Sequence, residues 1–213
     1  MHACPYCYVR AISRRFGGTA HTGALRLKTD ELKVRYGSGR TIFVEHSNDL
    51  FQEQVKRWWL DLILGHCGDW PDNTYVFQTR NVGRMVNWFP WLPDRVILGT
   101  TIETDNDAPG AAPHPHDRAL GMKMLKGALP SPLRFVTIEP ILDFNVDGML
   151  ALLERASPDF INIGADSKGH GLEEPSAEKV LELIDGIGKM GIEIRQKKNL
   201  ERILNKQKKR GGE

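Results

Sequence analysis

The chain has 213 residues, of which 40% are hydrophobic and 26% charged, and its formal net charge is +2. This composition is typical of one globular domain that is long enough to bury a core without disulfides. Its three cysteines are too few for a secreted disulfide framework, and no apolar run reaches the ~18 residues of a membrane span. No signal-peptide pattern opens the sequence, so we expect a cytoplasmic protein outside the membrane.

The first sixteen residues carry the most informative chemistry. Cys4 and Cys7 are separated by two residues, at the start of a segment whose pattern predicts an amphipathic helix. Two thiols at this spacing can bind a metal or a cluster, or form a reversible disulfide. A glycine-rich turn is predicted at 17–23, and residues 25–36 are compatible with a short helix or an extended excursion.

Beyond residue 40, short apolar runs rich in β-branched and aromatic residues alternate with helical patterns. Asn48 or Asp49 is expected to cap the first of the helices that follow. The predicted strands are 41–44, 74–77, 95–98, 133–138, 160–163 and 192–194. The predicted helices cover about 50–63, 82–89, a dozen residues after the loop 104–117, 146–155 and 176–190.

This alternation predicts an α/β protein with a parallel sheet covered by helices, closed or partly closed as a barrel. Periodicity alone does not separate a barrel from an open doubly wound sheet. Nearly every predicted strand ends in acids, amides or hydroxyls, and both architectures place their sites at these carboxyl ends. We therefore expect a single domain over 1–213 with its site at this end, followed by a basic helical tail over about 197–213.

The thiols have three interpretations, two of which are a redox dithiol and a zinc site. The sequence Cys-Pro-Tyr-Cys is typical of glutaredoxins, which also need a strand directly before the first cysteine. A zinc site would combine Cys4 and Cys7 with partners such as His46, His66 or Cys67.

The third interpretation is an iron–sulfur cluster held by three thiolates at C-x3-C-x2-C spacing. Cys4 and Cys7 would be the second and third of these, and the first position falls one residue before Met1. Tyr6 supplies the aromatic residue that commonly precedes the last thiolate.

Short strings along nearly the whole chain, in the expected order, resemble radical SAM enzymes. The likeness is greatest to a small phage-associated branch that is distantly similar to spore photoproduct lyase. The strings are Cys4-Pro-Tyr-Cys-Tyr8 with Arg14-Arg-Phe16, Phe43-Val44 with Ser47-Asn-Asp-Leu-Phe51, Thr74-Tyr-Val-Phe-Gln-Thr-Arg-Asn81, Leu98-Gly-Thr-Thr-Ile-Glu103, Arg134-Phe-Val-Thr-Ile-Glu-Pro140 and Gln196-Lys197.

The resemblance implies a partial (βα)6 TIM-like barrel with a [4Fe-4S] cluster after its first strand. S-adenosylmethionine (SAM) would bind the open iron, and a reductant such as flavodoxin or ferredoxin would supply an electron. Cleavage would give a 5′-deoxyadenosyl radical that modifies an unknown substrate, with a nucleotide or nucleic acid among the candidates. The family's first strand and first cysteine are missing from this sequence. We therefore expect the chain to be N-terminally truncated relative to the family, and inactive as given.

The resemblance also assigns roles to residues by their position, although each of them could instead cap a helix or satisfy loop backbone. Cys4 and Cys7 would ligate the cluster. The residues expected to contact the cofactors are Tyr6, Glu45, Ser47, Thr101, Glu103 and Glu139, with Glu45 and Ser47 near the methionine amino group and Thr101 and Glu103 near the ribose. The candidates on the substrate side are Gln78, Arg80, Asp166 and Lys197.

A different class of function remains open from the sequence. The stretch from Lys197 to Arg210 is dominated by Lys and Arg, with Glu201 its single acid. Such a run can contact phosphates. The alternative is therefore a non-catalytic protein on the same scaffold that binds nucleic acid through this tail or holds a zinc ion.

Overall fold

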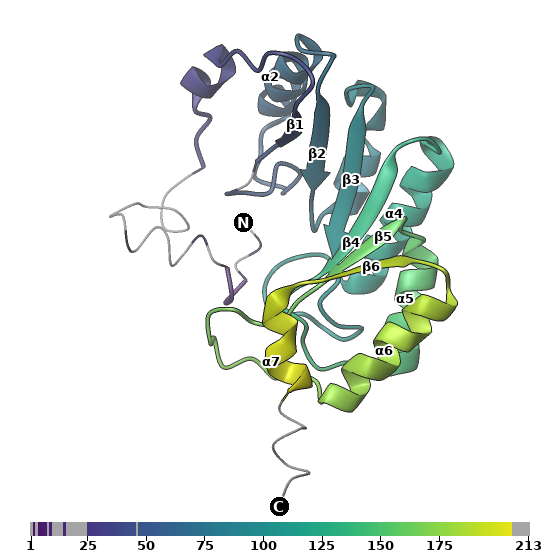
Figure 1. The fold of residues 1–213 in the computed structure, drawn as a ribbon. Helices are drawn as coiled ribbons and strands as arrows, with labels where there is room; N and C mark the ends of the chain where they lie inside the picture. The colour runs from purple at the N-terminus through teal and green to yellow at the C-terminus, as the bar shows by residue number, and fades with distance from the viewer. Residues whose placement is uncertain are drawn as a thin grey trace, which may run out of the picture.

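The computed structural model describes residues 2, 4–7, 9, 15, 25–45 and 47–205 (Figure 1). Most of the helix predicted in the first sixteen residues lies outside this part of the chain, as do the turn predicted at 17–23, His46 and the tail after 205.

Six strands form one sheet, and every neighbouring pair is parallel. The strands lie side by side in chain order, so that each one pairs with the next. Among the described strands the sheet is not closed, and its edges are the first and the last (Figure 1). The predicted α/β alternation is thus confirmed. The strands are β1 (Thr41–Phe43), β2 (Thr74–Gln78), β3 (Val96–Thr101), β4 (Leu133–Ile138), β5 (Phe160–Ile163) and β6 (Glu193–Gln196).

Helices connect successive strands and cover one face of the sheet. In Figure 1, α4, α5 and α6 lie along the outer side of the curved sheet. The α-helices are α2 (Arg57–Gly68), α3 (Val82–Val86), α4 (Pro115–Ala128), α5 (Val146–Ala156), α6 (Ala177–Lys189) and α7 (Glu201–Leu204). The 3-10 helices are η1 (Thr29–Lys33), η2 (Phe89–Trp91) and η3 (Lys198–Leu200).

The helix predicted to begin near residue 50 begins only at Arg57. The reason lies in Asp49, which was expected to cap that helix. Its carboxylate instead accepts hydrogen bonds from the Thr79 hydroxyl (2.6 Å) and the Arg80 backbone N–H (2.9 Å) at the end of β2. These bonds hold residues 47–55 as a series of turns against the sheet. Leu50 and Phe51 are still buried there.

The later helices begin at side-chain caps that their sequences supply. The Asn145 side chain accepts from the backbone N–H of Gly148 (2.9 Å), and Ser176 accepts from that of Lys179 (3.3 Å). His114 caps α4 in the same way, and Pro115 follows at the first helical position, where no backbone donor is needed.

Alternation along the strands separates the core from the inner face of the sheet. In β2, Tyr75 and Phe77 are fully buried in the main core, whereas Val76 and Gln78 are half-buried and line a cavity on the other face. Successive strand residues point to opposite faces. The inner face of the sheet is therefore the one left for a ligand.

Candidate functional site

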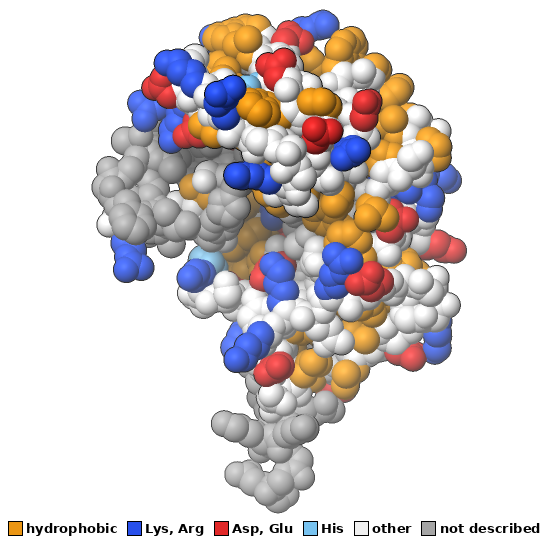
Figure 2. All heavy atoms as spheres, turned by 45° about the horizontal axis from the view of Figure 1, so that its top comes forward, with side chains coloured by type: hydrophobic (Ala, Val, Ile, Leu, Met, Phe, Trp, Pro, Cys, Tyr) orange, Lys and Arg blue, Asp and Glu red, His pale blue; other side chains and the backbone are white. Residues whose placement is uncertain are grey.

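One cavity of about 890 Å³ opens at the carboxyl ends of the strands and extends along their inner face. Figure 2 shows the molecule hollowed here, with hydrophobic side chains in the hollow and Lys and Arg around it. All of the site residues expected from the sequence line this cavity, except Glu103. They are Cys4, Tyr6, Cys7, Glu45, Ser47, Gln78, Arg80, Thr101, Glu139, Asp166 and Lys197.

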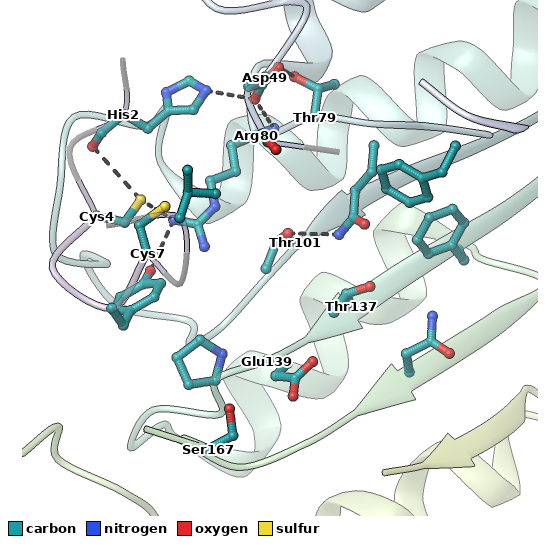
Figure 3. A pocket seen from close by; sticks show the side chains of 18 of the residues that line it. His2, Cys4, Cys7, Asp49, Thr79, Arg80, Thr101, Thr137, Glu139 and Ser167 are labelled. Atoms are coloured by element: carbon teal, nitrogen blue, oxygen red, sulfur yellow. Dashed lines mark hydrogen bonds and ion pairs between the residues drawn. The ribbon is translucent and has the colours of Figure 1, made fainter. Parts of the chain in front are cut away.

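The two N-terminal thiols are brought together by a tight turn. The backbone N–H of Cys7 donates to the carbonyl of Cys4 (3.2 Å), with Pro5 at the second position of the turn, which proline favours. Both sulfur atoms lie beside Arg80 in Figure 3. The segment is held in place through His2, whose ring contacts Asp49 (2.7 Å) and whose carbonyl accepts from the Ala111 N–H (2.6 Å).

Arg80 connects the thiol segment to the sheet. Its guanidinium donates to the sulfur of Cys4 and to the Tyr6 hydroxyl, and it forms an ion pair with Glu103. The Tyr6 ring also lies under the guanidinium, 5.2 Å from ring centroid to Cζ. The end of β2 thus places a cationic donor directly against the sulfur of Cys4.

Glu103 lies beneath the cavity and does not line it. Its side chain is fully buried, and its carboxylate accepts from the Tyr6 hydroxyl (2.9 Å) and from Arg118 (2.7 Å) in addition to Arg80. Burial alone would raise the pKa of Glu103, but the two guanidinium groups lower it below its ordinary value. In this structure the carboxylate anchors two arginines, and it is not placed to meet a ribose. No pattern in the sequence had indicated Arg118 as a partner of this carboxylate.

Burial also governs the titration of the neighbouring groups. It raises the pKa of the Cys4 thiol, although Arg80 opposes the shift, and it raises the pKa of Tyr6, with the charge of Glu103 adding to the effect. For Asp49, burial would raise the pKa, but hydrogen bonds from His2 and Thr79 lower it overall. Asp49 and Glu103 are therefore both stabilised as carboxylates.

At the other side of the mouth, charged residues are paired with one another. Lys197 forms an ion pair with Glu139, and Asn199 donates to the same carboxylate (2.9 Å). The carboxylate of Asp166 accepts from the backbone N–H groups of Lys168 (3.0 Å) and His170 (2.5 Å). Arg202 pairs with Glu174, so the described part of the predicted basic tail uses two of its cations internally.

Two residues that line the cavity, Glu45 and Gln52, have polar side chains that could contact a ligand. Glu45 has a positive φ of 61°, a backbone conformation that residues other than glycine rarely adopt. Its side chain lines the cavity and forms no ion pair with the described residues. Burial raises its pKa, and the charge of Asp49 adds to this. Gln52 is 1% exposed, yet both its amide atoms lack a hydrogen-bond partner among the described residues. Such buried, unsatisfied groups are rare in native proteins and need an explanation.

Sequence reasoning missed the inner-face residues below the mouth. Phe135 and Thr137 on β4, Phe160 and Asn162 on β5, and Arg195 on β6 all line the cavity. A signal was available, because these residues alternate with core residues along their strands. Phe135 and Thr137 precede the expected site residue Glu139 at spacings of two.

The two described partners proposed for a zinc site lie away from Cys4. His66 and Cys67 are on α2, and Cys67 is in the main core, whereas Cys4 belongs to a separate small cluster with Tyr6. Burial raises the pKa of Cys67 to about 12. Within the part of the chain that the structure describes, no group of three or more His, Cys, Asp or Glu side chains is arranged to hold a metal ion.

Comparison with models of protein families identifies the family of this chain. The family model described as "Protein of unknown function (DUF5131)" matches residues 1–193. The chain belongs to the DUF5131 family. No curated protein and no solved structure matches it. In this DUF5131 protein the matched span takes in the thiol turn and the cavity residues of the first five strands, while Arg195 and Lys197 follow it. No helix in the described ranges has both the length and the apolar character to cross a bilayer.

Proposed function

We propose that this protein is a radical SAM enzyme, with a partial (βα)6 barrel whose mouth holds the cofactors. The observation that carries the proposal is the meeting of two N-terminal thiols with the carboxyl ends of parallel strands in one large cavity. Sites in barrel and doubly wound α/β proteins form at this end of the sheet. The volume of about 890 Å³ lies at the upper end of the range for small-molecule sites.

The residues present fit these cofactors in part. Cys4 and Cys7 would hold two irons of a [4Fe-4S] cluster, and no third cysteine of the described residues lines the cavity, because Cys67 lies in the main core. The unsatisfied amide of buried Gln52 fits a polar ligand in the same cavity. When bound, the cluster would supply the electron that cleaves the carbon–sulfur bond of SAM to give the 5′-deoxyadenosyl radical.

The chain's own residues would bind and orient these groups. Arg80 donates a hydrogen bond to the sulfur of Cys4, and its charge opposes the rise in the pKa of this thiol that burial causes. A metal requires the thiolate form. Glu45 offers a carboxylate to the amino group of methionine, with the Ser47 hydroxyl nearby on the cavity wall.

On the neighbouring strands, Thr101 is positioned for the ribose, because its hydroxyl already accepts from Gln78 (3.0 Å) and keeps a proton to donate. Glu139 follows the next strand, where its carboxylate pairs with Lys197. Glu103, expected at the ribose, would act through Arg80 instead.

The test is anaerobic reconstitution with iron and sulfide. The chain is compared with a version extended upstream to place a cysteine four residues before Cys4. We expect about four irons per chain, and 5′-deoxyadenosine from SAM under a strong reductant, in the extended form.

A matched pair of variants makes the result specific. In the extended form, Cys4→Ala should abolish both signals. Cys67→Ala should retain them, because that thiol is 1% exposed in the core and remote from the cavity. If neither the given nor the extended chain binds iron and cleaves SAM, or if Cys67→Ala is as damaging as Cys4→Ala, the proposal is wrong.

A further inference from the structure

Below the polar mouth, planar side chains from adjacent strands are stacked against one another across the inner face of the sheet. The rings of Phe135 and Phe160, which are register partners on β4 and β5, are stacked at 10° with their centroids 5.3 Å apart. The guanidinium of Arg195 lies over the Phe160 ring, with Cζ 3.7 Å from the centroid. Three π-faced groups from three adjacent strands thus lie in one stack, which we name the ring wall (Phe135, Phe160 and Arg195).

A glycine on β3 makes room for this wall. A Cβ at Gly99 would collide with three ring atoms of Phe135, so the ring occupies the space above that strand where a side chain would otherwise stand. Gly99 is the register partner of Phe135. The Phe135 ring therefore extends over the backbone of β3.

The outermost member of the ring wall is fixed and accessible. Glu193 binds one edge of the guanidinium, accepting from Nε (2.7 Å) and Nη2 (3.3 Å) of Arg195. The Arg195 side chain is nonetheless 50% exposed and lines the cavity. A guanidinium held flat in this way offers a stacking surface to a planar ligand.

Residues with hydrogen-bonding side chains follow Phe135 and Phe160 by two positions, nearer the carboxyl ends of the strands. Thr137, Asn162 and Arg195 are register partners across β4, β5 and β6. All three line the cavity, and the described residues offer no hydrogen-bond partner to the Thr137 hydroxyl or the Asn162 amide. An amide provides a donor and an acceptor side by side, which matches the edge of a nucleobase.

We propose that the ring wall is the subsite for the base of a nucleotide substrate. A planar ring would stack on the Arg195 guanidinium, the exposed end of the wall, which Phe160 supports from behind, and the polar edge of the ring would meet Asn162 and Thr137. Phosphate groups would be attracted by Lys168, a cavity cation whose ammonium is without a partner among the described residues. This inference rests on the proposed function, because the cofactors would occupy the mouth above the wall and leave this lower part of the cavity to the substrate.

Binding of mononucleotides to the full chain tests the inference without requiring a cluster. AMP, GMP, CMP and UMP are titrated by calorimetry. Ribose 5-phosphate and L-phenylalanine are the control ligands, because neither has a nucleobase. We expect at least one nucleotide to bind at least tenfold more tightly than either of these. Tighter binding of L-phenylalanine would assign the wall to an aromatic amino acid and overturn the inference.

Variants then locate the site. Phe160→Leu and Arg195→Gln should each weaken nucleotide binding by about 5- to 150-fold, which corresponds to the ~1–3 kcal/mol of base–aromatic stacking. Gly99→Ala should weaken it too, by displacing the Phe135 ring. The matched controls are Trp91→Leu, an exposed aromatic outside the cavity, and Arg202→Gln, a paired arginine of the tail. Equal losses in the controls and the wall variants would overturn the inference.

A competition experiment distinguishes a substrate site at the ring wall from the binding site of SAM. Nucleotide should still bind when SAM is present at saturation, and SAM affinity should be unchanged by Phe160→Leu. If SAM displaces the nucleotide and loses affinity in that variant, the wall holds the adenine of SAM and the inference is wrong. Because these measurements record binding alone, a negative result here is distinct from a failure of iron binding or SAM cleavage.

Discussion

The substitution Glu103→Gln should destabilise the fold severely, because it removes the one negative charge between two buried cations. Glu103 has a fully buried side chain, and its partners Arg80 and Arg118 are only 14% and 1% exposed. Glutamine has nearly the same volume, so the change opens no cavity. Removing one partner of a buried ion pair leaves an uncompensated charge and costs about 3–5 kcal/mol. We expect a loss of this size.

The loss is measured by urea unfolding followed through tryptophan fluorescence. In a thermal melt of the same variant, a loss of ~3–5 kcal/mol in a chain of this length corresponds to a melting temperature lower by about 6–20 °C. The control is Asp185→Asn, which breaks the exposed Lys189–Asp185 pair and should leave the midpoint unchanged. If Glu103→Gln were as stable as the control, the charge of Glu103 would not hold the arginines, and the account of this network would be refuted.

Two further predictions concern buried polar groups. Asn73→Ala should cost about 1–3 kcal/mol in the same assay, since the Asn73 side chain accepts from the Arg40 N–H (2.9 Å) and donates to the Gly37 carbonyl (2.9 Å); an unchanged midpoint would contradict this. For Asp166, burial would raise the pKa, but bonds from the Lys168 and His170 backbone N–H groups lower it overall. Its contribution is therefore present above its ordinary pKa and is lost as the pH falls through the lowered value. The urea midpoint should fall less between about pH 7 and about pH 3 in Asp166→Asn than in the parent chain, and equal falls would contradict this.

Five of the six strands could be predicted from the sequence because each contains a compact apolar run bounded by polar residues, whereas Ile194 is the one apolar residue of β6. Their order in the sheet follows from the alternation with helices. The start of α2 could not be predicted. Leu50 and Phe51 have helical spacing with later residues, but the competing bonds of Asp49 come from Thr79 and Arg80, about thirty positions along the chain.

In the candidate site, too, features set by neighbouring residues could be predicted, whereas contacts with residues far along the chain could not. Polar residues at strand ends were expected to meet, and all but Glu103 line one cavity. Glu103 differs because its carboxylate is satisfied by Arg80, which lies two residues after β2, and by Arg118 from α4. Whether a strand-end carboxylate is available for a ligand depends on partners from other elements, and the pattern around the residue does not record them.

The balance of charges in the cavity bears on what it can bind. Asp49, Glu139 and Asp166 each have a basic partner, in His2, Lys197 and His170 respectively. Glu45 is the exception among the described carboxylates of the cavity, since it forms no ion pair with the described residues and its pKa is raised by burial and by Asp49. A cationic group bound at Glu45 would relieve both effects, because an opposite charge stabilises the ionised form. SAM carries an amino group and a sulfonium, so the arrangement favours a ligand of its charge over an anion at this side of the mouth.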